Sequence, residues 1–160
     1  MNTLVVYFSR SGRTRKLAKE VAEKLSADLD EIREARGRSG PIGWIKSGME
    51  STRKALPKLL PPVKDPAKYD LVVLGTPIWA SNMSSPMRAY ITEHRDAIKE
   101  AAFILTGDGN DPQSVFEPME ELLERAPVAT LSLIGKEREG DARIEKIEGF
   151  VNTLATLGAP

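Results

Sequence analysis

The stretch LVVYFSRSGRTRKLAKEVAEKL, residues 4–25, decides the fold class because it changes from a strand pattern to a helix pattern across one short loop. Leu4 to Phe8 is apolar throughout and rich in branched residues, which is typical of a strand buried on both faces. Leu17, Val21 and Leu25 then recur at helical spacing. A buried strand that runs directly into an amphipathic helix predicts an α/β domain with a parallel sheet.

The same alternation continues along the chain. Strands are predicted at Leu71–Leu74, Ala102–Leu105 and Val128–Leu133, and a weaker edge strand at Leu29–Arg33. Helical spacing follows in three further sets: Met87, Ile91 and Ile98; Val115, Met119, Leu122 and Ala126; Ile144, Ile147, Val151 and Leu154. We therefore expect one domain over residues 1–160, a three-layer, doubly wound sheet of five parallel strands.

The composition restricts the possible functions. The 160 residues include 23 Lys plus Arg and 23 Asp plus Glu, so no overall field of one sign directs the protein to nucleic acid or an anionic membrane. There is no cysteine and one histidine, which argues against a disulfide, a thiolate nucleophile or a metal site, and any redox chemistry needs a bound cofactor. The first apolar run is too short to span a membrane, and we expect a cytoplasmic protein.

Residues 36–62 interrupt the alternation and are interpreted as an insertion. Six basic residues and a single acidic residue, Glu50, lie between Arg36 and Lys58. This charge favours a solvated surface helix anchored by Trp44 and Ile45, although a docking patch for an acidic partner is the alternative.

The loop after the first strand has the composition of a phosphate site. Its hydroxyl groups can donate to phosphate oxygens, its glycine allows close backbone approach, and the first N–H groups of the following helix favour an anion. The spacing matches neither a P-loop nor a dinucleotide fingerprint. Helix capping alone is the competing explanation for these residues, which are Ser9, Arg10, Ser11, Gly12, Arg13 and Thr14.

The pattern Ser-x-Ser-Gly-x-Thr over residues 9–14 resembles the phosphate-binding loop of the flavodoxin family. That resemblance implies the strand order 2-1-3-4-5 and a loop that surrounds the 5′-phosphate of FMN. The segment Gly75–Ala80, after the second long strand, is similar to the family loop that places an aromatic ring against the flavin. It implies flavin contacts from Thr76, Pro77, Ile78, Trp79 and Ala80. Trp79 is the predicted stacking ring, with ordinary core packing as the alternative.

The third loop, Thr106–Pro112, matches the family less well because no aromatic residue occurs between Gly107 and Val115. One flavin face is therefore expected to be open. Gly107 and Gly109 could bring backbone N–H groups to the flavin, and Asp108 near a reduced, anionic flavin would disfavour reduction. Alternatively, Asp108 and Asn110 only shape a turn.

The resemblance implies an FMN-dependent redox protein that transfers electrons to a larger partner, with no catalytic side chain. An NAD(P)H-dependent oxidoreductase acting on a quinone or similar small acceptor is an alternative. A regulatory domain of the same fold that does not hold flavin is a second alternative. His94 shares a helix face with Met87 and Ile91, so we expect it to be packed and not catalytic.

Overall fold

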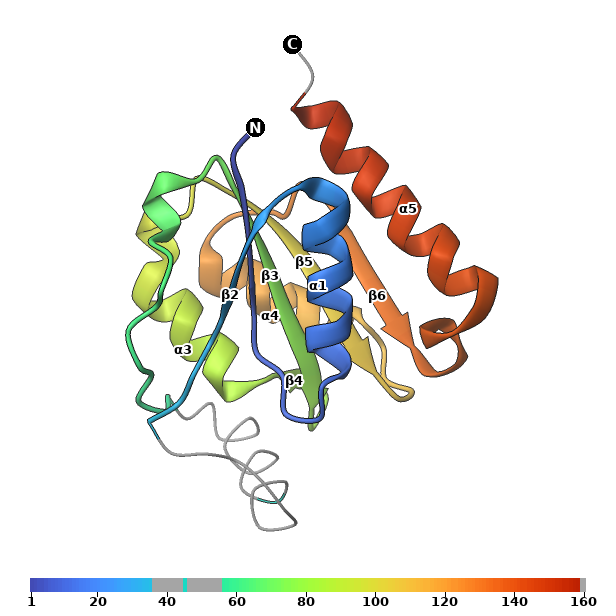
Figure 1. Ribbon diagram of the computed structural model, residues 1–160. Coiled ribbons are helices and arrows are strands. Elements are labelled where there is room, and N and C mark those ends of the chain that lie inside the picture. The colour runs from blue at the N-terminus through green and yellow to red at the C-terminus, as the bar shows by residue number, and fades with distance from the viewer. Residues whose placement is uncertain (36–44, 46–55, 159–160) are drawn as a thin grey trace.

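The computed structural model describes residues 1–35, 45 and 56–158. Its sheet contains five parallel strands in the order β2-β1-β3-β5-β6, as Figure 1 shows. Their bounds are β1 Thr3–Tyr7, β2 Asp28–Glu31, β3 Leu71–Trp79, β5 Glu100–Gly107 and β6 Thr130–Ile134. The two-residue strand β4, Asn82–Met83, pairs antiparallel with the end of β3. The predicted fold and the order 2-1-3-4-5 of the parallel strands are confirmed.

Helices cover both faces of this sheet (Figure 1). On one face, α1 (Arg13–Leu25) and α5 (Gly140–Leu157) pack their buried residues against the strands, and on the other face α3 (Ser85–His94) and α4 (Gln113–Leu123) do so. Within the described residues, three short 3-10 helices connect the elements: η1 Pro66–Lys68, η2 Arg95–Ala97 and η3 Gly135–Arg138.

The strand β1 shows why the first apolar run has no polar position. Leu4 and Val6 belong to the core cluster on the α3 and α4 face, whereas Val5 and Tyr7 belong to the cluster on the α1 and α5 face. Because neighbouring side chains alternate between two covered faces, every position of a central strand must be apolar.

Strand β3 is longer than the sequence predicts. We predicted a loop from Gly75 onward, but Gly75, Thr76 and Pro77 pair with β5, and Ile78 and Trp79 pair with β4. Pairing with β4 and β5 keeps the β3 backbone extended through Gly75 and Pro77, although glycine and proline usually predict the end of a strand.

The outer edge of β2 is covered by the end of the predicted insertion. The Leu60 N–H donates to the Arg33 carbonyl at 2.8 Å, and the Lys64 N–H donates to Oδ2 of Asp30 at 2.8 Å. These contacts place residues 60–64 beside the end of β2 and beside its Asp30 side chain, which limits the access of another chain to this edge. The predicted surface helix over residues 44–56 lies outside the described residues, except for Ile45 and Leu56, which are both exposed.

No helix in the described parts of the chain combines the length and the apolar character needed to cross a membrane.

Candidate functional site

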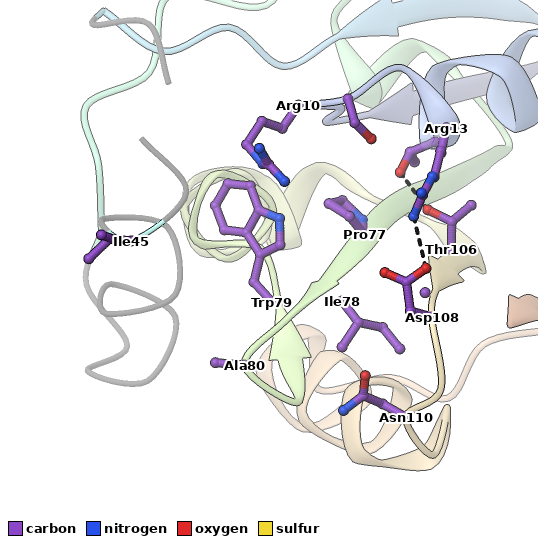
Figure 2. A pocket seen from close by; sticks show the side chains of 13 residues that line it. Arg10, Arg13, Ile45, Pro77, Ile78, Trp79, Ala80, Thr106, Asp108 and Asn110 are labelled. Atoms are coloured by element: carbon purple, nitrogen blue, oxygen red, sulfur yellow. Dashed lines mark hydrogen bonds and ion pairs between the residues drawn. The ribbon is translucent and has the colours of Figure 1, made fainter. Parts of the chain in front are cut away.

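A cavity of about 470 Å³ opens at the carboxyl ends of the strands, between the three predicted segments (Figure 2). Ten of the fourteen predicted site residues line it, whereas Ser9, Gly12, Thr76 and Gly109 do not. The complete lining is Arg10, Ser11, Arg13, Thr14, Ile45, Pro77, Ile78, Trp79, Ala80, Thr106, Gly107, Asp108 and Asn110. Segments far apart in the sequence meet here because parallel strands end at the same edge of the sheet.

The first loop leads to a helix start that no side chain caps. Gly12 is the N-cap residue of α1 with φ of 96°, a left-handed conformation that glycine adopts without strain. Ser9 caps the turn and not the helix, since its Oγ accepts the Gly12 N–H at 3.0 Å. The first N–H groups of α1 therefore have no side-chain acceptor, and the predicted capping role does not account for this loop.

Two hydroxyl groups of this loop have different surroundings. Thr14 is buried, and its Oγ1 lies 2.9 Å from Oγ1 of Thr106 on β5, which fixes α1 against the sheet. The Ser11 side chain lines the cavity and makes no hydrogen bond within the described part of the chain. The Ser11 hydroxyl thus faces the cavity and can donate to a ligand without breaking a hydrogen bond within the described part of the chain.

The end of β3 contributes mostly apolar atoms. Trp79 is 7% exposed and lines the cavity. Its ring meets the Phe8 ring edge-on, with ring centroids 5.3 Å apart and an interplanar angle of 88°. Trp79 is therefore packed in the core and also forms part of the cavity wall, and its stacking on a flavin stays a prediction. The Thr76 hydroxyl is buried and bonded to Ser84, so its side chain is committed to the start of α3 and not to the cavity.

The third loop is tied to its neighbours by polar contacts. The Asn110 amide donates to Oγ of Ser81 at 3.0 Å, which joins this loop to the turn after β3. Gly107 faces the side chain of Ile78: a Cβ placed there would lie 2.7 Å from Ile78 Cδ1. A side chain at position 107 would therefore require the end of the Ile78 side chain to move.

Asp108 is held between two arginines. Its Oδ1 accepts from Nη1 of Arg13 at 2.9 Å and from Nη1 of Arg138 at 2.6 Å. These hydrogen bonds, first that of Arg138, hold the pKa of Asp108 below its ordinary value. The positive charges of Arg13 and Arg138 offset the negative charge that we expected Asp108 to place near a flavin. The Asp108 carboxylate therefore binds these two arginines and does not stabilise a turn.

Three residues that line the cavity, Ile45, Thr106 and Asn110, were not among the predicted site residues. Thr106 and Asn110 lie within the predicted third loop, where neither was assigned a contact with the ligand. Arg138, which does not line the cavity but contacts Asp108, was also missed. The signal available was weak: Arg138 follows the last strand at the same sheet edge as the other loops, which is the position expected of a site residue in this fold. The predicted packing of His94 is confirmed, since its ring lies 4.6 Å from that of Tyr90.

Comparison with known proteins agrees with this geometry. A family model described as flavodoxin matches residues 2–95, which include the first loop and the end of β3. The chain belongs to the flavodoxin family. No curated protein matches this flavodoxin-family chain in sequence.

Solved structures show the same fold at low sequence identity. A flavoprotein from Lactobacillus acidophilus, solved in complex with FMN, is 19% identical with a TM-score of 0.72, and the alignment covers 92% of this flavodoxin-family chain and 98% of the other. A flavoprotein from Bacteroides eggerthii is 20% identical with a TM-score of 0.80, covering 96% and 98%. One from Bacteroides uniformis is 23% identical with a TM-score of 0.74, covering 91% and 97%.

Proposed function

We propose that the chain binds FMN in this cavity and works as a flavin-dependent electron-transfer protein. The observation that carries the proposal is the start of α1, where no side chain caps the helix beside the cavity. Trp79 also lines this cavity, and the chain belongs to the flavodoxin family. FMN has a phosphate at one end and a flat ring system at the other, and the cavity has a matching chemistry at its two ends.

The phosphate end fits the donors that are present. The N–H groups at the start of α1, the Ser11 hydroxyl and the Arg13 guanidinium can all donate to phosphate oxygens, and a helix start favours a dianion. The Lactobacillus relative, which has the same fold, was solved with FMN. That complex supports the same ligand class here.

The ring end fits a flat, polarizable group. Pro77, Ile78, Trp79 and Ala80 form a mainly apolar wall, as Figure 2 shows. Bound FMN would supply the electron transfer, and the chain would supply binding, orientation and a local electrostatic environment. We assign no side chain of this site to acid or base chemistry.

A second function is favoured by one feature of the third segment. Gly107, Asp108 and Asn110 line the cavity without an aromatic ring, so a small acceptor such as a quinone could approach there, with NAD(P)H as the electron donor. Steady-state oxidation of NAD(P)H with a quinone by the FMN-loaded protein separates the two functions. Turnover supports the oxidoreductase, and its absence with retained flavin supports transfer to a protein partner.

The proposal is tested by titrating the purified protein, freed of any cofactor, with FMN, FAD and riboflavin, following flavin fluorescence. Tight binding of FMN, with much weaker binding of riboflavin, is expected because riboflavin lacks the phosphate. Equal affinity for FMN and riboflavin would contradict the role of the first loop. No binding of any flavin would leave a regulatory domain of the same fold as the better description.

A further inference from the structure

Arg138 contacts Asp108, which lines the cavity, and it lies in a part of the chain that the family match does not include, since the match ends at residue 95. It is the last residue of η3, which follows β6. Its guanidinium donates from Nε to the Gly135 carbonyl at 3.0 Å and from Nη1 to Asp108 Oδ1 at 2.6 Å. With a side chain 26% exposed, Arg138 is held more firmly than Arg13, whose side chain is 55% exposed.

The turn that carries Arg138 is itself anchored. Glu137 accepts the Ile134 N–H at 3.1 Å and pairs with Lys146 of α5 at 2.8 Å. Gly135 has φ of 55°, and a Cβ there would lie 3.0 Å from the Asp108 carbonyl oxygen, so η3 packs closely against the third loop. Arg138 therefore meets Asp108 from a fixed direction.

Arg13 has two possible partners, which compete. In this structure it pairs with Asp108, yet it is also the first residue of α1, where the proposed phosphate would bind. If Arg13 turned to a phosphate without other compensation, Asp108 would remain as a bare carboxylate close to a dianion, and like charges at that range repel.

We propose that Arg138 is a positioning residue that keeps Asp108 neutralised, so that Arg13 is available to the phosphate of the ligand. The inference rests on the proposed function, because it assigns a role toward the phosphate of FMN. Arg138 acts through Asp108 and Arg13 and does not itself contact the ligand in this scheme.

The scheme predicts a selective effect of Arg138→Gln. We expect affinity for FMN to fall by about threefold, the scale of one exposed ion pair, and affinity for riboflavin to stay unchanged because riboflavin lacks the phosphate. The loss of FMN affinity should shrink at high salt, where exposed charges are screened. Adding Asp108→Asn to Arg138→Gln should restore the wild-type affinity for FMN, because no carboxylate is then left to compensate.

Lys136→Gln is the matched control. It removes one positive charge from the same turn, but Lys136 has no side-chain contact with Asp108. Fluorescence titrations of wild type, Arg138→Gln, Lys136→Gln, Asp108→Asn and the double variant, each with FMN and riboflavin, complete the comparison. If Arg138→Gln does not fold, Asp108→Asn alone decides, since we expect it to bind FMN at least as tightly as wild type.

The outcomes separate the two proposals. Failure of the wild-type protein to bind FMN overturns the proposed function, and the role of Arg138 with it. If wild type binds FMN, then unchanged FMN affinity in Arg138→Gln, an equal loss for FMN and riboflavin, or an equal loss in Lys136→Gln overturns the role of Arg138 alone. Weaker FMN binding by Asp108→Asn than by wild type also overturns the role of Arg138.

Discussion

At the scale of single residues, Trp79 combines two roles that a substitution must separate. Its ring is packed against Phe8 and is also part of the cavity wall. Trp79→Ala should weaken FMN binding about tenfold or more if stacking contributes roughly 1 to 2 kcal/mol. It should also destabilise the free protein by about 3 to 5 kcal/mol, because a large buried side chain is lost.

Phe8→Leu is the control for that prediction. Phe8 belongs to the same core cluster as Trp79 but does not line the cavity. Chemical unfolding should show a loss of stability in both variants, whereas flavin titration should show a loss of affinity only in Trp79→Ala. A comparable loss of affinity in Phe8→Leu would mean that Trp79 acts through the core and not through contact with the ligand.

Tyr90 is 2% exposed, and its buried hydroxyl has no hydrogen-bond partner among the described residues. Burial raises the pKa of this phenol, so the hydroxyl stays protonated. Tyr90→Phe keeps the ring beside His94 and removes the unpaired group, and we expect stability to rise by about 1 kcal/mol. Thermal unfolding measures the change, and a lower midpoint would show that the hydroxyl has a stabilising partner.

At the scale of elements, β3 and β5 approach each other closely where they form the cavity floor. Gly107→Ala would place a Cβ 2.7 Å from Ile78 Cδ1 and 3.1 Å from Ile134 Cδ1. We expect a loss of about 1 kcal/mol of stability, the low end of the usual effect of overpacking, because the crowded atoms belong to isoleucine side chains that can move. Chemical denaturation measures it, and Ile78→Val in the same chain should recover part of the loss because it removes the crowded methyl group.

Gly109→Ala is the matched control in the same loop. A Cβ at position 109 meets no atom within 4 Å, so this variant should keep wild-type stability. Equal destabilisation by both substitutions would show that backbone freedom in the loop, and not the contact with Ile78, explains the glycine at position 107.

Much of the element structure could be predicted because it depends on local pattern. The apolar run at Leu4–Phe8 and the helical spacing after it are visible in the sequence. The extension of β3 to Trp79 was not, because Gly75 and Pro77 stay extended through pairing with β5, whose contacting residues are distant in the sequence. Arg138 was missed for the same reason: it lies 30 residues from Asp108, and they meet only because β5 and β6 are neighbours.

At the scale of the whole molecule, three described carboxyl groups have lowered pKa values. The Tyr69 hydroxyl donates to Asp28 at 2.6 Å, Arg138 donates to Asp108, and Lys146 pairs with Glu137. In each case this contact is the main cause of the lowered pKa. A carboxyl group whose pKa is lower in the folded state stabilises the fold above its unfolded pKa and loses this effect as pH falls.

The thermal midpoint should therefore be nearly constant from about pH 7 to pH 5 and fall below about pH 4, near the ordinary pKa of carboxyl groups. Asp28→Asn should lower the midpoint at pH 7 and make the fall at low pH shallower. The control is Asp96→Asn, because the Asp96 side chain is fully exposed. A profile for Asp28→Asn that is parallel to that of wild type would contradict the role of the Tyr69 contact.

The strand order also determines when the binding cavity can come into existence. The first loop follows β1, which lies between β2 and β3 in the sheet. Asn2 and Asp70, just before β1 and β3, are in contact although they lie 68 positions apart in the sequence. Bringing the two ends of this long segment together costs conformational entropy before the hydrogen bonds between β1 and β3 form, and this cost slows folding. A growing or refolding chain can thus form α1 early and remain unable to hold a cofactor. Flavin capture therefore requires β1, β3 and β5 to be joined first, because the cavity is lined by residues at or just after the ends of all three strands.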